Sequence, residues 1–114
     1  MKIKCEIYEP MYDFNDKKYI RVKLMDKVKY YIEGLHDNKS HLIATNNIDN
    51  PLEGNVLKLK VPFRYRRVMC LVHGDKPVQS LIRGDDVEID VQFSGVWNCA
   101  NHSGFSWKIK EIFT

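Results

Sequence analysis

The sequence contains no long apolar run and no apolar segment near its N-terminus. Its uninterrupted apolar stretches span a few residues, as in Val68–Val72, whereas crossing a bilayer takes about 20. We therefore expect no membrane-spanning segment. From Lys2 to Ile7, charged and apolar residues alternate, which differs from the apolar core of a secretory signal. The sequence predicts an intracellular protein that does not associate with membranes.

Cysteine is scarce and widely spaced. The three cysteines, Cys5, Cys70 and Cys99, are odd in number and do not form a disulfide framework, so we expect reduced thiols. Two Cys-x-x-His pairs, Cys70/His73 and Cys99/His102, contain the ligand types of a tetrahedral zinc site. Buried cysteine is, however, a frequent core residue. We predict no metal and no cofactor, with zinc as the alternative.

Motifs with a known catalytic mechanism are also missing. There is no Gly-rich phosphate loop, no Gly-x-Ser-x-Gly and no His-Glu-x-x-His. The histidines, or the pairs Asp13/Asp16 and Asp85/Asp86, could supply bases or metal ligands to a hydrolase, but turn-forming aspartates explain these pairs more simply. We predict a protein that binds without catalysing a reaction.

The composition is that of one globular domain. With 114 residues, 44% of them hydrophobic and 29% charged, the chain is long enough for one core and too apolar for a disordered protein. We expect a single domain over residues 1–114. The net charge of +3 permits an anionic partner without requiring one, so the distribution of charge must decide.

Alternating polarity predicts a mainly β protein. The segments with period-2 alternation or strand composition are 2–8, 19–24, 57–65, 68–72, 87–93 and 105–109. Turn-forming residues predict a long hairpin loop over 9–16, an exposed loop over 46–55 and a polar turn over 98–104, and residues 40–45 could form a short strand. Pro62 lacks a backbone donor, so its strand should be bulged, broken or at an edge.

One segment has helical periodicity. Val28, Tyr31, Ile32 and Leu35 fall on one face of a helix over Asp26–Leu35, which Asp26 could cap. Strands separated by turns, with one short helix, indicate a small barrel or sandwich.

Two segments near the C-terminus carry a resemblance to a known family. Arg83–Trp97 contains a Gly-Asp strand entry, and Gly104–Ile109 forms a closing strand; together they resemble single-stranded DNA-binding proteins of the OB-fold type, of viral or phage origin. The resemblance covers about the last third of the chain. It implies a small OB-like β-barrel with a groove for one nucleic-acid strand, acting in replication, recombination or repair, in the cytoplasm or nucleus and in an infected host cell. One departure is the expected helix, which follows the second strand, whereas an OB fold has its helix after the third.

A basic segment interleaved with aromatics is the main candidate interface. Phosphates attract its five cations and unpaired bases stack on its aromatic rings. The candidate residues are Lys58, Lys60, Arg64, Tyr65, Arg66 and Arg67. The alternative is a solvated strand face whose Phe63 and Tyr65 belong to the core.

Aromatic residues near two turns are further candidates. Trp97, beside the polar turn, is predicted to stack on bases, whereas Trp107 alternates with Ile109 and is predicted to lie in the core. If the first hairpin projects, Tyr12, Phe14 and Lys18 could clamp a strand, although mixed charge there could also serve solubility alone.

These features predict a protein that binds single-stranded DNA, or RNA, with little sequence preference. The acidic residues between Asp85 and Asp90 would repel phosphate, so the interface should lie elsewhere. The alternative is a protein–protein interaction module, because the same residue types dominate protein interfaces. A homodimer is a further possibility, if the strand Val56–Val61 has an exposed edge.

Overall fold

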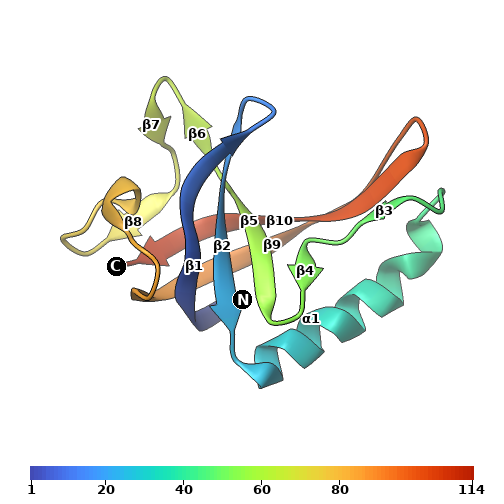
Figure 1. Ribbon diagram of the computed structural model, residues 1–114, viewed down its shortest axis with the longest axis horizontal. Helices are drawn as coiled ribbons and strands as arrows, with labels where there is room; N and C mark the ends of the chain where they lie inside the picture. The colour runs from blue at the N-terminus through green and yellow to red at the C-terminus, as the bar shows by residue number, and fades with distance from the viewer.

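The computed structural model describes the whole chain, Met1–Thr114, and its long strands curl into a barrel-like ring (Figure 1). Five strands are hydrogen-bonded in the order β1–β2–β5–β10–β9, and β9 pairs with β1 to complete the ring. Neighbours are antiparallel except β5 and β10, which run parallel and are joined at Lys60 and Lys108. The strands are β1 (Lys2–Phe14), β2 (Lys17–Leu24), β3 (Ile48–Asp49), β4 (Leu52–Glu53), β5 (Val56–Val61), β6 (Phe63–Arg64), β7 (Arg67–Val68), β8 (Leu71–His73), β9 (Asp86–Cys99) and β10 (His102–Phe113). The predicted fold class, mainly β with one short helix, is confirmed.

The interior of the ring is filled by the alternating apolar residues of the long strands. Nineteen buried residues form one cluster, to which all five ring strands contribute. Trp107 is 4% exposed and belongs to this cluster, as its alternation with Ile109 predicted. Val78 and Leu81, from the connection between β8 and β9, join the same cluster. One core therefore includes residues from most of the chain.

The first hairpin is tighter than predicted. We expected a loop over residues 9–16, but β1 continues to Phe14 and the turn consists of Asn15 and Asp16. Both have positive φ, 51° and 63°, a conformation that asparagine and aspartate tolerate best among non-glycine residues. Pro10 is accommodated because it lies where the β1–β2 register is interrupted, so its missing donor leaves no ladder bond unmade.

The helix α1 (Asp26–Lys39) starts where predicted but is one turn longer. Ile32 and His36 are its buried residues, whereas Tyr31, which we placed on the apolar face, is exposed. Asp26 does not cap the helix; its carboxylate accepts a hydrogen bond of 2.7 Å from the Asn55 side chain. As expected, α1 follows the second strand of the ring, so the departure from the usual OB arrangement stands.

Three short segments differ from the predicted strands and loops. Residues 40–45 do not form a strand, because η1 (Ser40–Leu42) is a 3₁₀ turn that continues from α1. The loop 46–55 contains the two-residue strands β3 and β4. The segment 68–72 is divided between β7 and β8, and the connection that follows contains a second 3₁₀ turn, η2 (Val78–Ser80).

The strand predicted over 57–65 is broken at Pro62, one of the three outcomes expected for it. β5 ends at Val61, and the chain then forms a separate two-stranded hairpin of β6 and β7. β5 is not an exposed edge, because it pairs with β2 on one side and with β4 and β10 on the other. The basis on which we predicted a homodimer through Val56–Val61 was therefore wrong.

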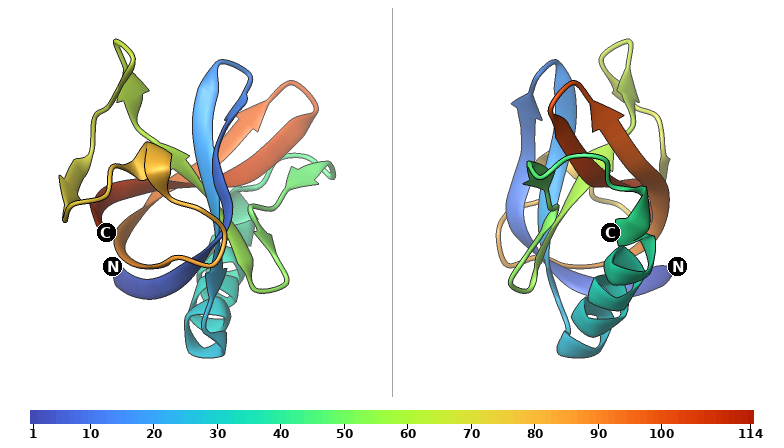
Figure 2. Two further views of the ribbon diagram at one scale, coloured as in Figure 1. Left: turned by 60° about the vertical axis from the view of Figure 1, so that its left-hand side comes forward. Right: turned by 90° about the vertical axis from the view of Figure 1, so that its right-hand side faces the viewer.

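Three hairpins project from the same end of the ring. Figure 2 shows the tips of β1–β2, β6–β7 and β9–β10 on the same side of the molecule in both views. The β9–β10 turn occupies Ala100 and Asn101, so the predicted turn over 98–104 is shorter than expected. No helix has the length and apolar character that a membrane span requires.

Candidate nucleic-acid interface

A groove lies over the outer face of β2 and β5. The β1–β2 and β9–β10 hairpins, whose positions Figure 2 shows, bound it on two sides. Its volume is about 680 Å³. Aromatic and cationic side chains gather on its floor and both walls; the principal ones are Phe14, Lys17, Tyr19, Lys58, Lys60, Trp97 and Phe105. We refer to this site as the groove.

The floor of the groove follows from strand alternation. Ile20 and Leu59 point into the core, so their neighbours in sequence, among them Tyr19 and Lys60, face outward and lie opposite each other in the β2–β5 ladder. The Lys58 ammonium lies 5.1 Å from the centre of the Tyr19 ring and 3.6 Å from the Asp49 carboxylate. Burial, and then the nearby charge of Asp49, raise the pKa of the Tyr19 hydroxyl, so the ring is a neutral phenol at neutral pH.

The β1–β2 hairpin supplies one wall. The tight turn places Phe14 and Lys17 opposite each other at its base, and Phe14 is 58% exposed. Neither Lys17 nor Lys60 forms an ion pair within the protein. The groove therefore has two ammonium groups without a carboxylate partner, beside a largely exposed aromatic ring.

The β9–β10 hairpin supplies the other wall, and two glycines shape it. Gly95, at φ 120°, lies where the β9–β10 register slips by one residue, and such a bulge bends and twists the ladder. Gly104 lies under the Trp97 ring: a Cβ there would be 2.7 Å from both Trp97 Cζ2 and the Asp49 carbonyl oxygen. The absence of a side chain at Gly104 lets the indole lie against the strand.

Behind this wall, α1 holds β10 through one buried histidine. His36 stacks on Phe105 with ring centres 4.1 Å apart and planes 6° from parallel. The Trp107 indole N–H donates a 2.9 Å hydrogen bond to His36 Nε2, which must be unprotonated to accept it. Phe105 also lines the groove, so α1 supports the groove wall directly.

Protonation of His36 should destabilise the fold. Burial lowers its pKa below the ordinary 6.5, despite the opposing charge of Asp37. Well above pH 6.5 the side chain is neutral in both states and stability is at its full value; as pH falls through 6.5, the unfolded chain binds the proton first and stability declines. Urea unfolding at pH 7, 6 and 5 should show this loss in the wild type and in His41→Gln, because His41 is exposed.

In His36→Leu, whose side chain cannot be protonated, the free energy of unfolding should decline less between pH 7 and pH 5. The carboxyl groups of Asp85 and Asp90 have lowered pKa values, so their contribution is lost only below about pH 3.8, outside the range measured. An equal pH dependence in wild type and His36→Leu would contradict the assignment to His36.

The structure brings together four of the ten residues predicted to bind nucleic acid. These are Phe14, Lys58, Lys60 and Trp97. Tyr12 lies beside the groove, with its ring centre 5.9 Å from that of Tyr19, whereas Lys18 points to the opposite face, where it pairs with Asp13 and lies 4.9 Å from the centre of the Phe63 ring. The remaining four occupy the separate β6–β7 hairpin: Arg64, Tyr65, Arg66 and Arg67.

The structure decides whether Phe63 and Tyr65 belong to the core, as the alternative for the basic segment required. Tyr65 is 83% exposed at a turn, so it is not part of the core. Phe63 is only half-buried, so it is not a full member of the core either. Trp97 is half-buried rather than free, because it rests on Gly104.

Three of the principal aromatic and cationic residues of the groove, namely Lys17, Tyr19 and Phe105, were not among the ten residues predicted to bind nucleic acid. Tyr19 alternates with Ile20, which marks it as outward-facing, and this signal was present in the sequence. An isolated glycine within a strand pattern, here Gly95, indicates a bulge and could have predicted the bent hairpin. No local signal connects Phe105 to His36, which lies 69 positions away in the sequence.

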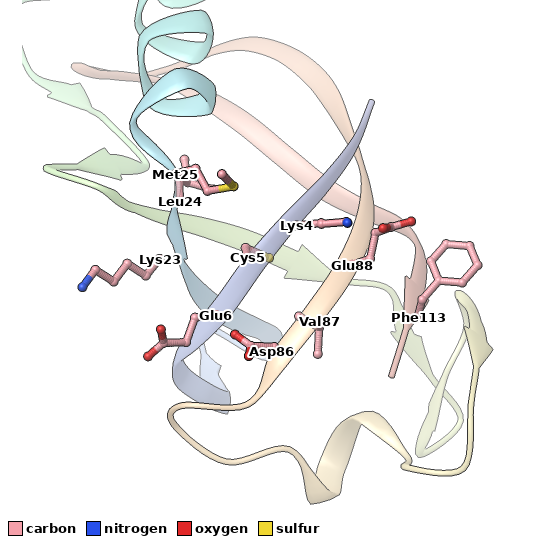
Figure 3. A pocket seen from close by; sticks show the side chains of 10 residues that line it. All are labelled: Lys4, Cys5, Glu6, Lys23, Leu24, Met25, Asp86, Val87, Glu88 and Phe113. Atoms are coloured by element: carbon pink, nitrogen blue, oxygen red, sulfur yellow. The ribbon is translucent and has the colours of Figure 1, made fainter.

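A second cavity, of about 580 Å³, lies across β9, β1 and β2 (Figure 3). Lys4 extends toward Glu88, its register partner on β9, and Glu6 lies beside Asp86. The lining contains three carboxylates and two lysines, so its formal charge is negative. The acidic stretch of β9 contributes two of these three carboxylates, those of Asp86 and Glu88.

The two Cys-x-x-His pairs do not form a common site. His73 is the register partner of Phe113 at one end of β10, whereas Cys99 and His102 face each other at the other end. A strand of this length spans on the order of 30 Å, and no cluster of three or more potential metal ligands occurs. The four-ligand zinc site considered from the sequence is therefore wrong.

Comparison of the chain with protein-family models, with curated proteins and with solved structures found no match.

Proposed function

We propose that this protein binds single-stranded DNA with little sequence preference and acts inside the cell in replication, recombination or repair. The observation that carries the proposal is the groove, in which aromatic rings and unpaired lysines lie between two projecting hairpins. Stacking and phosphate attraction are the two interactions that single-strand binding uses, and neither distinguishes bases well. A single strand of RNA presents the same chemistry and is the other ligand to be compared.

The position of the groove supports the proposal independently of its composition. It lies over β2 and β5, the second and third ring strands in chain order. It lies between the β1–β2 hairpin, which joins the first ring strand to the second, and the β9–β10 hairpin, which joins the fourth to the fifth. OB folds bind oligonucleotides on the corresponding strands and loops. This likeness favours an OB-type function despite the different position of α1.

The direct test is a fluorescence-anisotropy titration with single-stranded and duplex oligonucleotides at low and physiological salt. We expect preference for single strands and an affinity that falls as salt rises. Absence of single-strand binding at low salt would exclude the proposal.

The reactivity of Cys99 provides a second readout within the groove. Cys99 is exposed and lines the groove, whereas burial raises the pKa of Cys70 and raises that of Cys5 to about 12, which suppresses their reactive thiolates. We expect one fast-reacting thiol toward a maleimide, absent in Cys99→Ser, and slowed several-fold or more by a saturating single-stranded oligonucleotide. Unchanged labelling of Cys99 in the saturated complex would place the strand outside the groove.

A protein–protein interaction module is the second candidate function. The observation that favours it is a set of exposed apolar side chains on residues 69–82, namely Met69 (54%), Leu71 (61%), Val72 (36%) and Ile82 (63%). Contiguous exposed apolar patches mark interaction sites, and these four side chains come from one segment of the chain. If this is the main function, a partner should be retained equally with and without excess oligonucleotide, and groove substitutions should not affect it.

A further inference from the structure

The β6–β7 hairpin carries cationic and aromatic side chains that make few contacts with the rest of the protein. Arg64, Tyr65, Arg66 and Arg67 are all exposed. None of the three arginines forms an ion pair or a side-chain hydrogen bond, and Tyr65 is 83% exposed. Packing within the protein therefore does not account for these residue types.

The turn of this hairpin is built from residues that suit it poorly. Tyr65 and Arg66 have φ of 53° and 61°, nearly the values of Asn15 and Asp16 in the first hairpin. Two-residue turns of this kind favour asparagine followed by glycine, because bulky side chains crowd the backbone at positive φ. A tyrosine and an arginine here strain the turn, which indicates that their side chains serve another purpose.

The hairpin is attached next to the groove. β6 follows β5 directly, so Arg64 lies four residues beyond Lys60 on the groove floor, a span of at most about 14 Å. The base of the hairpin is held by a 2.7 Å hydrogen bond from the Met69 N–H to the Pro62 carbonyl. The ammonium of Lys18, on β2, lies over the Phe63 ring at 4.9 Å. The short connection from Lys60 keeps the arginines within reach of a strand that leaves the groove, whereas Lys18 holds Phe63 on the face of β2 opposite the groove.

We infer that the β6–β7 hairpin is a second contact for the same single strand that occupies the groove, with phosphates bound by Arg64, Arg66 and Arg67 and one base stacked on Tyr65. This inference rests on the proposed function. It assigns the protein a binding footprint longer than the groove alone.

The test uses a variant that removes the contact but favours the turn. Tyr65→Asn and Arg66→Gly create the preferred turn pair, and Arg64→Gln with Arg67→Gln remove the remaining charges. We expect this quadruple variant to unfold in urea no earlier than the wild type. A loss of binding by this variant would then not be caused by unfolding of the hairpin.

The measurement is affinity against oligothymidylate length, from about 4 to about 16 nucleotides, the range of OB-fold site sizes. The quadruple variant should bind the shortest oligonucleotide as the wild type does and the longest roughly tenfold or more weakly. For the longest oligonucleotide, the decrease of log affinity with log salt should be less steep by about 2, since each of three lost phosphate contacts contributes about 0.7 to the slope.

The alternative outcomes are distinguishable. Equal affinities of variant and wild type at every length would overturn the inference and leave the groove proposal intact. An equal loss at every length would make the hairpin part of the groove site and contradict the longer footprint. A complex with two oligonucleotides per protein would show a second strand at the hairpin and contradict one continuous strand. Absence of binding by the wild type at all lengths would reject the proposed function and this inference together.

Discussion

Replacing Phe14 and Trp97 with alanine is expected to weaken single-stranded DNA binding at least roughly 30-fold. These rings come from opposite walls of the groove and line it together. Stacking of a base on an aromatic ring contributes about 1–3 kcal/mol, so losing two such contacts should cost about 2 kcal/mol or more. Anisotropy titration of a labelled oligothymidylate at physiological salt measures the effect.

A matched control comes from α1. Tyr30 and Tyr31 are 64% and 57% exposed, and neither lines the groove. The double variant Tyr30→Ala/Tyr31→Ala removes two exposed aromatic rings of similar size and should bind within about twofold of the wild type. Equal weakening by both double variants would mean that exposed aromatic rings contribute to binding wherever they lie. The groove would then not be the binding site.

Replacing Trp107 with alanine is expected to destabilise the fold by about 3–5 kcal/mol, the usual cost of truncating a large buried aromatic. Trp107 is 4% exposed, packs against Phe93 with ring centres 5.2 Å apart and donates its indole N–H to His36. Truncation would leave a cavity between α1 and β10 and remove the donor to a buried nitrogen. This cost is a large part of the total stability of about 5–15 kcal/mol typical of a domain. Urea denaturation followed by circular dichroism measures it.

Two further variants keep this prediction testable if Trp107→Ala does not fold. Trp107→Phe retains an aromatic ring but loses the hydrogen bond, so we expect a smaller loss, on the order of 1–2 kcal/mol. Trp97→Ala removes a half-buried ring outside the core cluster and should cost less than Trp107→Ala. A greater loss of stability in Trp97→Ala would contradict the assignment of the two tryptophans to wall and core.

The strands and their core were predictable because alternation is local. Leu57, Leu59 and Val61 must share one face of a strand wherever that strand lies, and all three are buried. The same reasoning identified Trp107 as a core residue. Beyond Pro62 the alternation continues in the sequence through Phe63 and Tyr65, but the strand does not, so the alternative that extended the pattern across the proline and placed both aromatics in the core was wrong.

The candidate site was predictable in part. Lys58 and Lys60 were correctly placed on the outer face of their strand, and Phe14 on a projecting hairpin. The basic segment 58–67 is continuous in the sequence. In the structure, the break at Pro62 divides it between the groove and the β6–β7 hairpin. The zinc hypothesis failed for a related reason, because spacing within each Cys-x-x-His pair contains no information about the distance between the pairs.

The sequence by itself determined the class of fold, the buried face of each long strand and the start of the helix, because period and propensity act between neighbouring residues. The tertiary structure alone decided the closure of the ring, in which Lys60 meets Lys108, and the support of Phe105 by His36. It also decided that Trp97 on β9 shares a groove with Lys58 on β5. These contacts join residues 39 to 69 positions apart, and strand pairing and core packing across the whole chain select them.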